Sequence, residues 1–391
     1  MALSWRSKLI QSEARAPDGF RSLAAATYRG STTVFPNAAA VKDTWNHDEA
    51  PYAYGLFGTP TTLELAARIA ELENGRHTFL TPGGQAAITL IYLALVRAGD
   101  HVLVPDSIYG PNREFAEGML RGLGIAVEAY DPLIGAGIER QIRGNTRLVW
   151  CESPGSATME VQDVPAIAAA GHRHGALVAL DNTYAAGILF DAFAHGVDIT
   201  MQAVTKYIGG HSDLLLGSVT VRDEALYQAI GKATYLTGMA VSPDDCALAL
   251  RGLQTLGVRL AHLERSTLAI ARWLSDRPEI ARVLHPALPS CPGHEIWKRD
   301  FTGSASVFSV LFDARYAEEA LFGFIDRLRL FKIGFSWGGV ASLVMPQFHL
   351  QRTLRAPDTP LVRFNVGLEE TEDLIADLDQ AFAGLAADKR G

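Results

Sequence analysis

The sequence predicts an α/β fold in which a mainly parallel central sheet is flanked by helices and followed by a smaller α+β C-terminal part. Two observations predict it. Short apolar runs recur between residues 61 and 255, and amphipathic or alanine-rich stretches separate them, which is typical of a parallel sheet buried on both faces. A long helical pattern at about residues 243–276 then leads into a second set of apolar runs, which indicates a smaller unit.

The elements follow in chain order. Residues 1–60 contain many turn residues and few periodic signals, so we expect an extended N-terminal arm. A helix follows in TTLELAARIAELENG, and Thr59 or Thr61 can cap its start. Its predicted buried face consists of Leu63, Ala66, Ile69 and Ala70. The predicted strands are HVLVP (101–105), RLVWCESP (147–154), LVALDNTY (177–184), LLLGSVTV (214–221), SVFSVLF (306–312) and LVRFNVG (361–367). The expected division is an arm (1–60), a large α/β domain (61–255) and a C-terminal α+β domain (256–391).

Composition and charge narrow the class of protein. The chain has 391 residues, of which 48% are apolar and 20% charged, so it can bury a sizeable core. Its net charge of −8, with no long run of either sign, argues against nucleic acid or an anionic membrane as a partner. Three widely spaced cysteines form neither a disulfide framework nor a zinc pattern, and no carboxylate–histidine set has metal-ligand spacing. The N-terminus lacks a signal-peptide core, and the longest apolar stretch is shorter than the ~20 residues of a membrane span, so we expect a cytoplasmic protein without a metal.

Two unusual polar residues follow apolar runs in the large domain. Asp181 ends the run LVALD, and Lys206 follows DITMQAVT. Taken singly, the aspartate is either a paired structural carboxylate or a ligand group, and the lysine is either a snorkelling surface residue or a buried amine with a lowered pKa. Ligands of open α/β sheets bind at the carboxyl ends of strands. Together, an acid and a lysine at neighbouring strand ends suit pyridoxal 5′-phosphate (PLP), which needs a lysine at its aldehyde carbon and an acid at its pyridinium nitrogen.

A helix start supplies a candidate phosphate site in the same domain. The run TFLTPGGQAAITL indicates a strand, a turn and a helix that begins near Gly84 and Gln85. Backbone N–H groups at a helix N-terminus bind phosphate through their unpaired donors and the helix dipole. By itself a Gly-Gly helix start is usually a tight turn, and this one is neither a Walker loop nor a dinucleotide fingerprint. Its value comes from its place in the same domain as Asp181 and Lys206.

Several longer runs resemble one enzyme family. Between about residues 20 and 385 the chain contains, in the family's order, the runs CESPGSATMEVQDVPAI, LDNTYAAGILF, AVTKYIGGHSD, HPALPSCPGHEIWKRDFTGS, FSWGG and RFNVGLEETEDLIADLD. They resemble the Cys/Met-metabolism PLP-dependent enzymes of fold type I, and within that family the bacterial cystathionine β-lyases. The resemblance implies a PLP cofactor, a sulfur amino acid as substrate, and a homo-oligomer, usually a tetramer built as a dimer of dimers with shared active sites.

The resemblance also implies roles for individual residues. Lys206 would bind the cofactor covalently and move the Cα proton of the substrate, Asp181 would hold the pyridinium nitrogen, and Tyr109 would stack on the ring. The further cofactor contacts would be Gly84, Gln85, Thr205, Tyr54 and Ser156. The substrate would be bound by Arg363, Ser336 and Trp337, with the arginine clamping the α-carboxylate.

The implied reaction is β-elimination from L-cystathionine, which yields homocysteine, pyruvate and ammonia, a transsulfuration step of methionine biosynthesis. The segment ESPGSATME resembles β-lyases, whereas γ-acting relatives usually carry an asparagine and a proline near Ser156. Three alternatives stay open: a broader cysteine-conjugate lyase or cysteine desulfhydrase, a γ-acting enzyme, and an inert regulator that keeps the fold.

The arm stretch YAYGLFGTPTT, residues 52–62, departs from the family pattern. In the family this segment crosses to the partner subunit, where a tyrosine and an arginine two residues later bind the cofactor phosphate. Tyr54 matches the tyrosine, but the arginine position is Leu56, which has no hydrogen-bond donor in its side chain. We expect Tyr54, Thr205 and the Gly84–Gln85 amides to bind the phosphate, with a cation or a water in place of the arginine.

Overall fold

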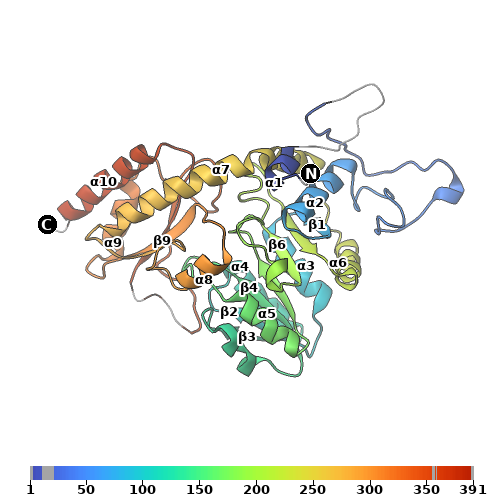
Figure 1. Cartoon of the computed structure of the whole chain (residues 1–391), viewed down its shortest axis with the longest axis horizontal. Coiled ribbons are helices and arrows are strands. Elements are labelled where there is room, and N and C mark those ends of the chain that lie inside the picture. Colours follow the sequence, from blue (N-terminus) through green and yellow to red (C-terminus); the bar gives the residue numbers. More distant parts are fainter. Residues whose placement is uncertain (1–2, 11–21, 355–356, 358, 389–391) are drawn as a thin grey trace.

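The computed structural model describes residues 3–10, 22–354, 357 and 359–388, so residues 1–2 and 11–21 of the predicted arm lie outside it. Two sheets are joined by the long helix α7 (Pro243–Ser275), which runs along both (Figure 1). The arm after residue 22 extends away from the body at the right of the view. Before it, α1 (Trp5–Ile10) packs against α7; six residues are too few for a periodic signal, so the sequence did not predict this helix.

The larger sheet has seven strands in the order β1-β7-β6-β5-β4-β2-β3. Their bounds are β1 (His77–Thr81), β2 (His101–Pro105), β3 (Ala126–Tyr130), β4 (Thr146–Glu152), β5 (Leu177–Asp181), β6 (Ile199–Gln202) and β7 (Gly217–Val221). β2 to β6 pair in parallel, whereas β7 runs antiparallel to both β6 and β1. This confirms the predicted α/β class with a mainly parallel sheet.

Helices cover both faces of this sheet. The α-helices of the large unit are α2 (Pro60–Leu72), α3 (Gly84–Leu95), α4 (Gly110–Glu114), α5 (Val164–Arg173) and α6 (Glu224–Thr237). Three short 3-10 helices, η1 (Ala38–Ala40), η3 (Gly135–Gln141) and η4 (Phe193–His195), and one π-helix, η2 (Phe115–Leu120), accompany them. Successive residues of β4 enter different cores: Val149 belongs to the cluster that includes residues of α2, α5 and α7, and Trp150 to the cluster that includes residues of α3 and α6. Because both faces are buried, the strands are apolar throughout rather than alternating.

The smaller sheet has the order β10-β11-β12-β9-β8. Its elements are β8 (Ile280–Leu284), α8 (His294–Asp300), β9 (Val307–Phe312), α9 (Glu318–Arg327), β10 (Lys332–Ile333), β11 (Leu343–Pro346), β12 (Leu361–Asn365) and α10 (Thr371–Asp388). Leu253 of α7 belongs to the core of the large unit and Leu274 to that of the small unit. The predicted domain boundary at residues 255/256 falls inside α7 and stays a prediction.

Helix α2 positions the arm on the body. Of the two predicted caps, Thr59 is the N-cap: its hydroxyl accepts from the Thr62 N–H, and the Thr62 hydroxyl accepts from the Thr59 N–H. Leu65 is fully buried and Leu63 only half-buried, because the helix packs against α7 as well as the sheet. Within the described ranges, no helix has both the length and the apolar character needed to cross a lipid bilayer.

Candidate active site

A cavity of about 440 Å³ lies at the carboxyl ends of the parallel strands, between the two sheets. The polar ends of β4 and β5 line it, and so do the loop after β6 and part of the small unit. Its lining includes every predicted site residue except Tyr54, namely Gly84, Gln85, Tyr109, Ser156, Asp181, Thr205, Lys206, Ser336, Trp337 and Arg363. Residues separated by up to 279 positions in the chain therefore meet in one place. The parallel strands of the large sheet end at the same edge, and the small unit contributes Ser336, Trp337 and Arg363 from the other side.

Lys206 lies in the turn that follows β6. Its Nζ donates to the Ser336 hydroxyl at 2.5 Å and lies 5.1 Å from the centre of the Trp337 ring. The pKa of Lys206 is lowered to about 8, mainly by burial and secondly by the positive charge of Arg363, while Asp181 acts in the opposite direction. The neutral amine, which is the nucleophilic and basic form, is therefore accessible near neutral pH.

Asp181 ends the central strand β5, next to β6 in the sheet. One carboxyl oxygen accepts a hydrogen bond from the Thr183 N–H at 3.0 Å. Burial raises the pKa of Asp181, whereas the contacts with Thr183 and the charge of Lys206 lower it. A buried acid in this position gains most from a cationic donor, such as a pyridinium N–H.

Glu152 is a second buried acid that the sequence reasoning missed. It ends β4 directly opposite Asp181 in the register, and its Oε2 accepts from the Tyr109 N–H at 2.7 Å. Burial, and secondly the negative charge of Asp181, raise the pKa of Glu152 well above its ordinary value. Glu152 thus holds the backbone of Tyr109, the residue predicted to stack on the cofactor. The signal was present, since Glu152 closes the apolar run RLVWC as Asp181 closes LVAL.

We expect Glu152→Gln to be at least as stable as the parent chain above neutral pH and to show a flatter dependence of stability on pH. A group whose pKa is raised by folding contributes stability at low pH that is lost as pH rises above its ordinary value of 4.5, and glutamine removes this loss. Glu152→Ala leaves the Tyr109 N–H unpaired and should lower the free energy of unfolding by about 1–3 kcal/mol. Denaturant unfolding at several pH values measures both, with Glu295→Gln on the exposed face of α8 as the control. Equal destabilisation by glutamine and alanine would show that the native carboxyl is charged.

The N-terminus of α3 faces the other end of the cavity. The helix begins at Gly84, and its N-cap residue Gly83 offers no side chain to the first N–H groups, which are left for a ligand. A Cβ on Gly84 would lie 2.8 Å from the Cβ of Ala203, so glycine allows the helix start to approach the lysine-bearing turn. The Oε1 of Gln85 is buried without a hydrogen-bond partner. Thr205 is less free than predicted, since its hydroxyl already donates to the Leu216 carbonyl.

The FSWGG loop connects Lys206 to Arg363. Ser336 has a φ of +76°, a left-handed conformation that is uncommon outside glycine. Its hydroxyl accepts from Lys206, and its carbonyl accepts from Nη2 of Arg363 at 3.2 Å. Asn365, two residues after Arg363 on β12, accepts from the Gly338 N–H at 3.0 Å and so fixes the loop. The sequence contained no signal for this role, because it depends on a contact across 27 residues.

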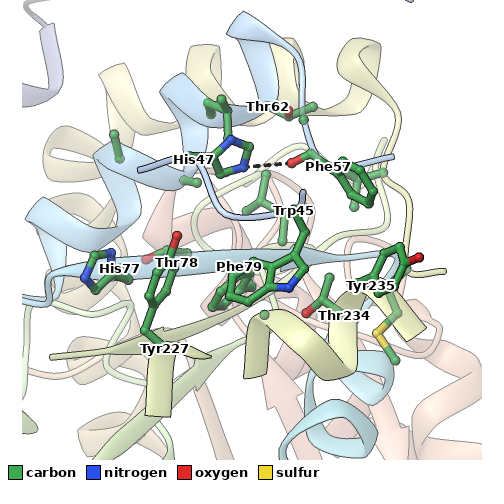
Figure 2. A pocket seen from close by; sticks show the side chains of 18 of the residues that line it. Trp45, His47, Phe57, Thr62, His77, Thr78, Phe79, Tyr227, Thr234 and Tyr235 are labelled. Atoms are coloured by element: carbon green, nitrogen blue, oxygen red, sulfur yellow. Dashed lines mark hydrogen bonds between the residues drawn. The ribbon is translucent and has the colours of Figure 1, made fainter. Parts of the chain in front are cut away.

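Tyr54 lies outside the cavity of its own chain. It lies on the arm, 48% exposed, and pairs through its backbone with Thr32. Leu56 instead lines a separate aromatic pocket of its own chain, together with Trp45 and Tyr227. Figure 2 shows this pocket, in which Nε2 of His47 and the carbonyl oxygen of Phe57 form a hydrogen bond of 3.0 Å. Leu56, at the position of the family's arginine, therefore faces a pocket of its own chain.

These features fit PLP. One cavity combines an amine of lowered pKa, a buried acid and a helix N-terminus without a side-chain cap. Lys206 would hold the aldehyde end, Asp181 the ring nitrogen, and the N–H groups at Gly84 and Gln85 the phosphate. In the same described part of the chain, no group of three histidine, cysteine or acidic side chains is placed to hold a metal ion.

Comparison with known proteins agrees with this fit and confirms the resemblance. Residues 6–383 match the family described as Cys/Met metabolism PLP-dependent enzyme. The chain is 47% identical to a putative cystathionine beta-lyase of Rhizobium johnstonii, over 91% of this chain and 90% of that protein. It is 42% identical to cystathionine beta-lyase MetC of Escherichia coli, over 91% of this chain and 92% of that protein. The crystal structure of metB from Corynebacterium glutamicum, 28% identical, matches with a TM-score of 0.91 over 98% of both chains. The chain belongs to the Cys/Met-metabolism family of PLP-dependent enzymes.

Proposed function

We propose that this enzyme cleaves L-cystathionine by β-elimination to homocysteine, pyruvate and ammonia. The observation that carries the proposal is the convergence of Lys206, Asp181 and Arg363 on one cavity. The two relatives named cystathionine beta-lyase, at 42% and 47% identity, support it. When bound, PLP supplies a conjugated ring that accepts the electron pair left at Cα after proton removal.

The chain's own side chains orient the substrate and move its protons. Arg363 offers its guanidinium fork to the α-carboxylate, and the Ser336 carbonyl holds that fork through Nη2. The neutral Nζ of Lys206 takes the Cα proton, since a pKa of about 8 suits a base near neutral pH. The same Nζ can deliver that proton to sulfur as the Cβ–S bond breaks, so homocysteine leaves as a thiol.

Other lining residues keep the reacting groups in place. Tyr109, held by Glu152, forms one wall of the cavity, and Trp337 packs on Tyr207 beside Lys206. Asp181 lies at the base and would stay ionised when paired with a pyridinium N–H, because an adjacent cation offsets its burial.

The alternatives differ in what they require of the site. Ser156 lines the cavity in the segment that resembles β-lyases, which supports β- over γ-elimination. An inert regulator would not need the complete set of lysine, acid and carboxylate-binding arginine. Purified enzyme should show the visible absorbance of bound PLP and release pyruvate and free thiol from L-cystathionine in equal amounts. A protein that gains no visible absorbance when PLP is added would contradict the proposed chemistry. A protein that shows this absorbance but cleaves no sulfur amino acid would favour the regulator.

We further propose a homotetramer assembled from dimers in the cytoplasm, with the three-part division of the chain given above. In each dimer the arm would carry Tyr54 to the partner's cavity. The exposure of Tyr54 and its place outside its own cavity support this arrangement.

Tyr54→Phe is expected to weaken PLP binding roughly 10- to 100-fold, because a hydrogen bond to a charged group contributes about 1.5–3 kcal/mol. Tyr52→Phe, an exposed tyrosine two residues away, is the matched control and should leave the dissociation constant unchanged. Titration of apoenzyme with PLP measures both. Mixing inactive Tyr54→Ala and Lys206→Ala chains should restore some activity, since one hybrid site would be intact. Unchanged affinity in Tyr54→Phe and no complementation would exclude a shared site.

A further inference from the structure

A tryptophan anchors the arm loop that carries Tyr54 on helix α6. The ring of Trp45 lies against Gly231 of α6, where a Cβ would be 1.9 Å from the ring atom Cζ3. The same ring meets Tyr227 of α6 edge-on, with 5.5 Å between the ring centres. The Tyr227 hydroxyl donates to Oδ1 of Asn46 at 3.3 Å. Only glycine at position 231 leaves room for this ring, so the loop starts from a fixed point on the body.

His47 closes the loop that follows. Its Nδ1 lies 3.2 Å from the carbonyl oxygen of Pro51, and its Nε2 lies 3.0 Å from that of Phe57 (Figure 2). A carbonyl oxygen only accepts, so each contact is a hydrogen bond only when the facing ring nitrogen has a proton. Neutral histidine has one N–H and the imidazolium has two. Only the cation therefore binds both carbonyls at once.

The closed loop fixes the backbone on both sides of Tyr54. The Tyr54 carbonyl accepts from the Phe57 N–H at 2.9 Å, and the Gly55 N–H donates to the Ser31 carbonyl at 2.8 Å. The rings of Phe57 and Tyr54 also meet edge-on, with 6.1 Å between their centres. Phe57, which His47 holds by its carbonyl, is thus joined to Tyr54 through the main chain and through its ring.

We propose that His47 is a positioning residue of the shared cofactor site: as the imidazolium it closes the 47–57 loop and holds Tyr54 where its hydroxyl meets the PLP phosphate in the partner's cavity. The inference rests on the shared-site arrangement proposed above and adds the residue that orders it. His47 acts through the Phe57 carbonyl and not on the cofactor itself. Histidine gains its second proton as the pH falls through the neutral range, so the contribution of His47 to PLP affinity should grow toward low pH.

The test titrates full-length apoenzyme with PLP at several pH values, with His47→Gln beside the parent chain. Glutamine has its amide donors on one atom, near the place of Nε2, so it can bind the Phe57 carbonyl but not that of Pro51. We expect the variant to bind PLP roughly three- to ten-fold more weakly at about pH 6, the effect of one hydrogen bond, and equally well at about pH 8.5, where the parent histidine also has one N–H. His174→Gln, an exposed histidine paired with Glu139, is the matched control and should follow the parent at every pH.

Other titratable groups around this loop stay in place in every variant. Within the described ranges they are Asp48 and Glu49 on the loop, Arg76 and His77 at the start of β1, and Glu224, Tyr227 and Tyr235 on α6. Helix α2 adds only Thr62, Leu63 and three alanines to the lining of the pocket in Figure 2. These groups, Lys206 and the PLP phosphate titrate alike in parent and variant. The ratio of the two dissociation constants at each pH therefore isolates His47.

A double-mutant cycle with Tyr54→Phe separates positioning from a general effect on the fold. If His47 acts through Tyr54, His47→Gln should cause no further loss of PLP affinity in a chain that already carries Tyr54→Phe.

Gly231→Ala displaces the loop independently. Alanine favours the helix, but its Cβ would take the place of the Trp45 ring. This variant should bind PLP roughly three-fold more weakly or worse, the effect of one hydrogen bond at Tyr54. Gly122→Ala, at a helical glycine with open space beside it, is the matched control and should bind PLP like the parent. Parent-like affinity in Gly231→Ala would show that the anchored loop does not position Tyr54 and would overturn the inference.

The remaining outcomes separate this inference from the proposals on which it rests. Release of pyruvate from L-cystathionine reports the β-lyase function and does not depend on His47. Unchanged PLP affinity in Tyr54→Phe would exclude the shared site, and the role of His47 with it. Weaker binding in Tyr54→Phe together with parent-like binding in His47→Gln at every pH would overturn the positioning role alone. A loss in His47→Gln that is equal at all pH values, or that persists in the Tyr54→Phe chain, would overturn it as well.

Discussion

Replacing Lys206 by alanine is expected to lower turnover by at least about 10³-fold and to remove the visible absorbance of the covalently bound cofactor. General-base catalysis alone contributes about 10²–10⁴-fold, and Lys206 also supplies the amine that binds the cofactor. Among the described residues that line the cavity, Lys206 is the only lysine.

Lys206→Arg separates charge from proton transfer. Arginine keeps a positive charge near the Ser336 hydroxyl but cannot be deprotonated in a protein. This variant should therefore be as inactive as the alanine variant, while Lys232→Ala, on the exposed face of α6, should retain full activity. Stopped-flow or steady-state pyruvate release measures the loss. Turnover that persists in both Lys206 variants would show that another group removes the Cα proton.

Replacing Arg363 by lysine is expected to lower kcat/KM roughly 10- to 100-fold, because one charge-assisted hydrogen bond is worth about 1.5–3 kcal/mol and lysine lacks the planar fork. Arg363→Met should lose at least as much and should change the pH dependence as well. The charge of Arg363 helps to lower the pKa of Lys206 to about 8, so removing this charge raises that pKa.

The sign of the pH effect follows from the form of the amine that reacts. Only neutral Lys206 attacks the cofactor aldehyde, so the rate at which apoenzyme takes up PLP should rise with pH through a midpoint near 8. In Arg363→Met the midpoint should move to higher pH, whereas Arg363→Lys, which keeps the charge, should leave it near the parent value. Loss of kcat/KM without a midpoint shift in the methionine variant would show that Arg363 does not influence Lys206 electrostatically.

Much of the architecture was predictable because it follows from the local pattern of apolar and polar residues. Apolar strands of five to seven residues, such as β2 and β4, alternate with helices, and this alternation predicts a parallel sheet. The antiparallel pairing of β1 and β7 was not predicted, since strand direction depends on the path of the connections rather than on composition. The place of Leu65 on the buried face of α2 depended likewise on its two packing partners.

The candidate site was predictable in part. Asp181 and Lys206 stand at the ends of apolar runs, so their type and position were visible without a structure. Glu152 had the same local signal, but its importance arises from its register opposite Asp181. Asn365 carried no local signal. Its role in fixing the FSWGG loop follows only from the hydrogen bond with Gly338, which is 27 residues away in the chain.

The sequence by itself determined the fold class, the family resemblance and the identity of the lysine, acid and arginine. These follow from periodicity and from residue types at strand ends, which are properties of short segments. The tertiary structure decided how burial and neighbouring charges act on these groups: the pKa of Lys206 is lowered and that of Glu152 is raised. Burial and electrostatic coupling depend on distances between residues far apart in the chain, and only the folded arrangement sets those distances.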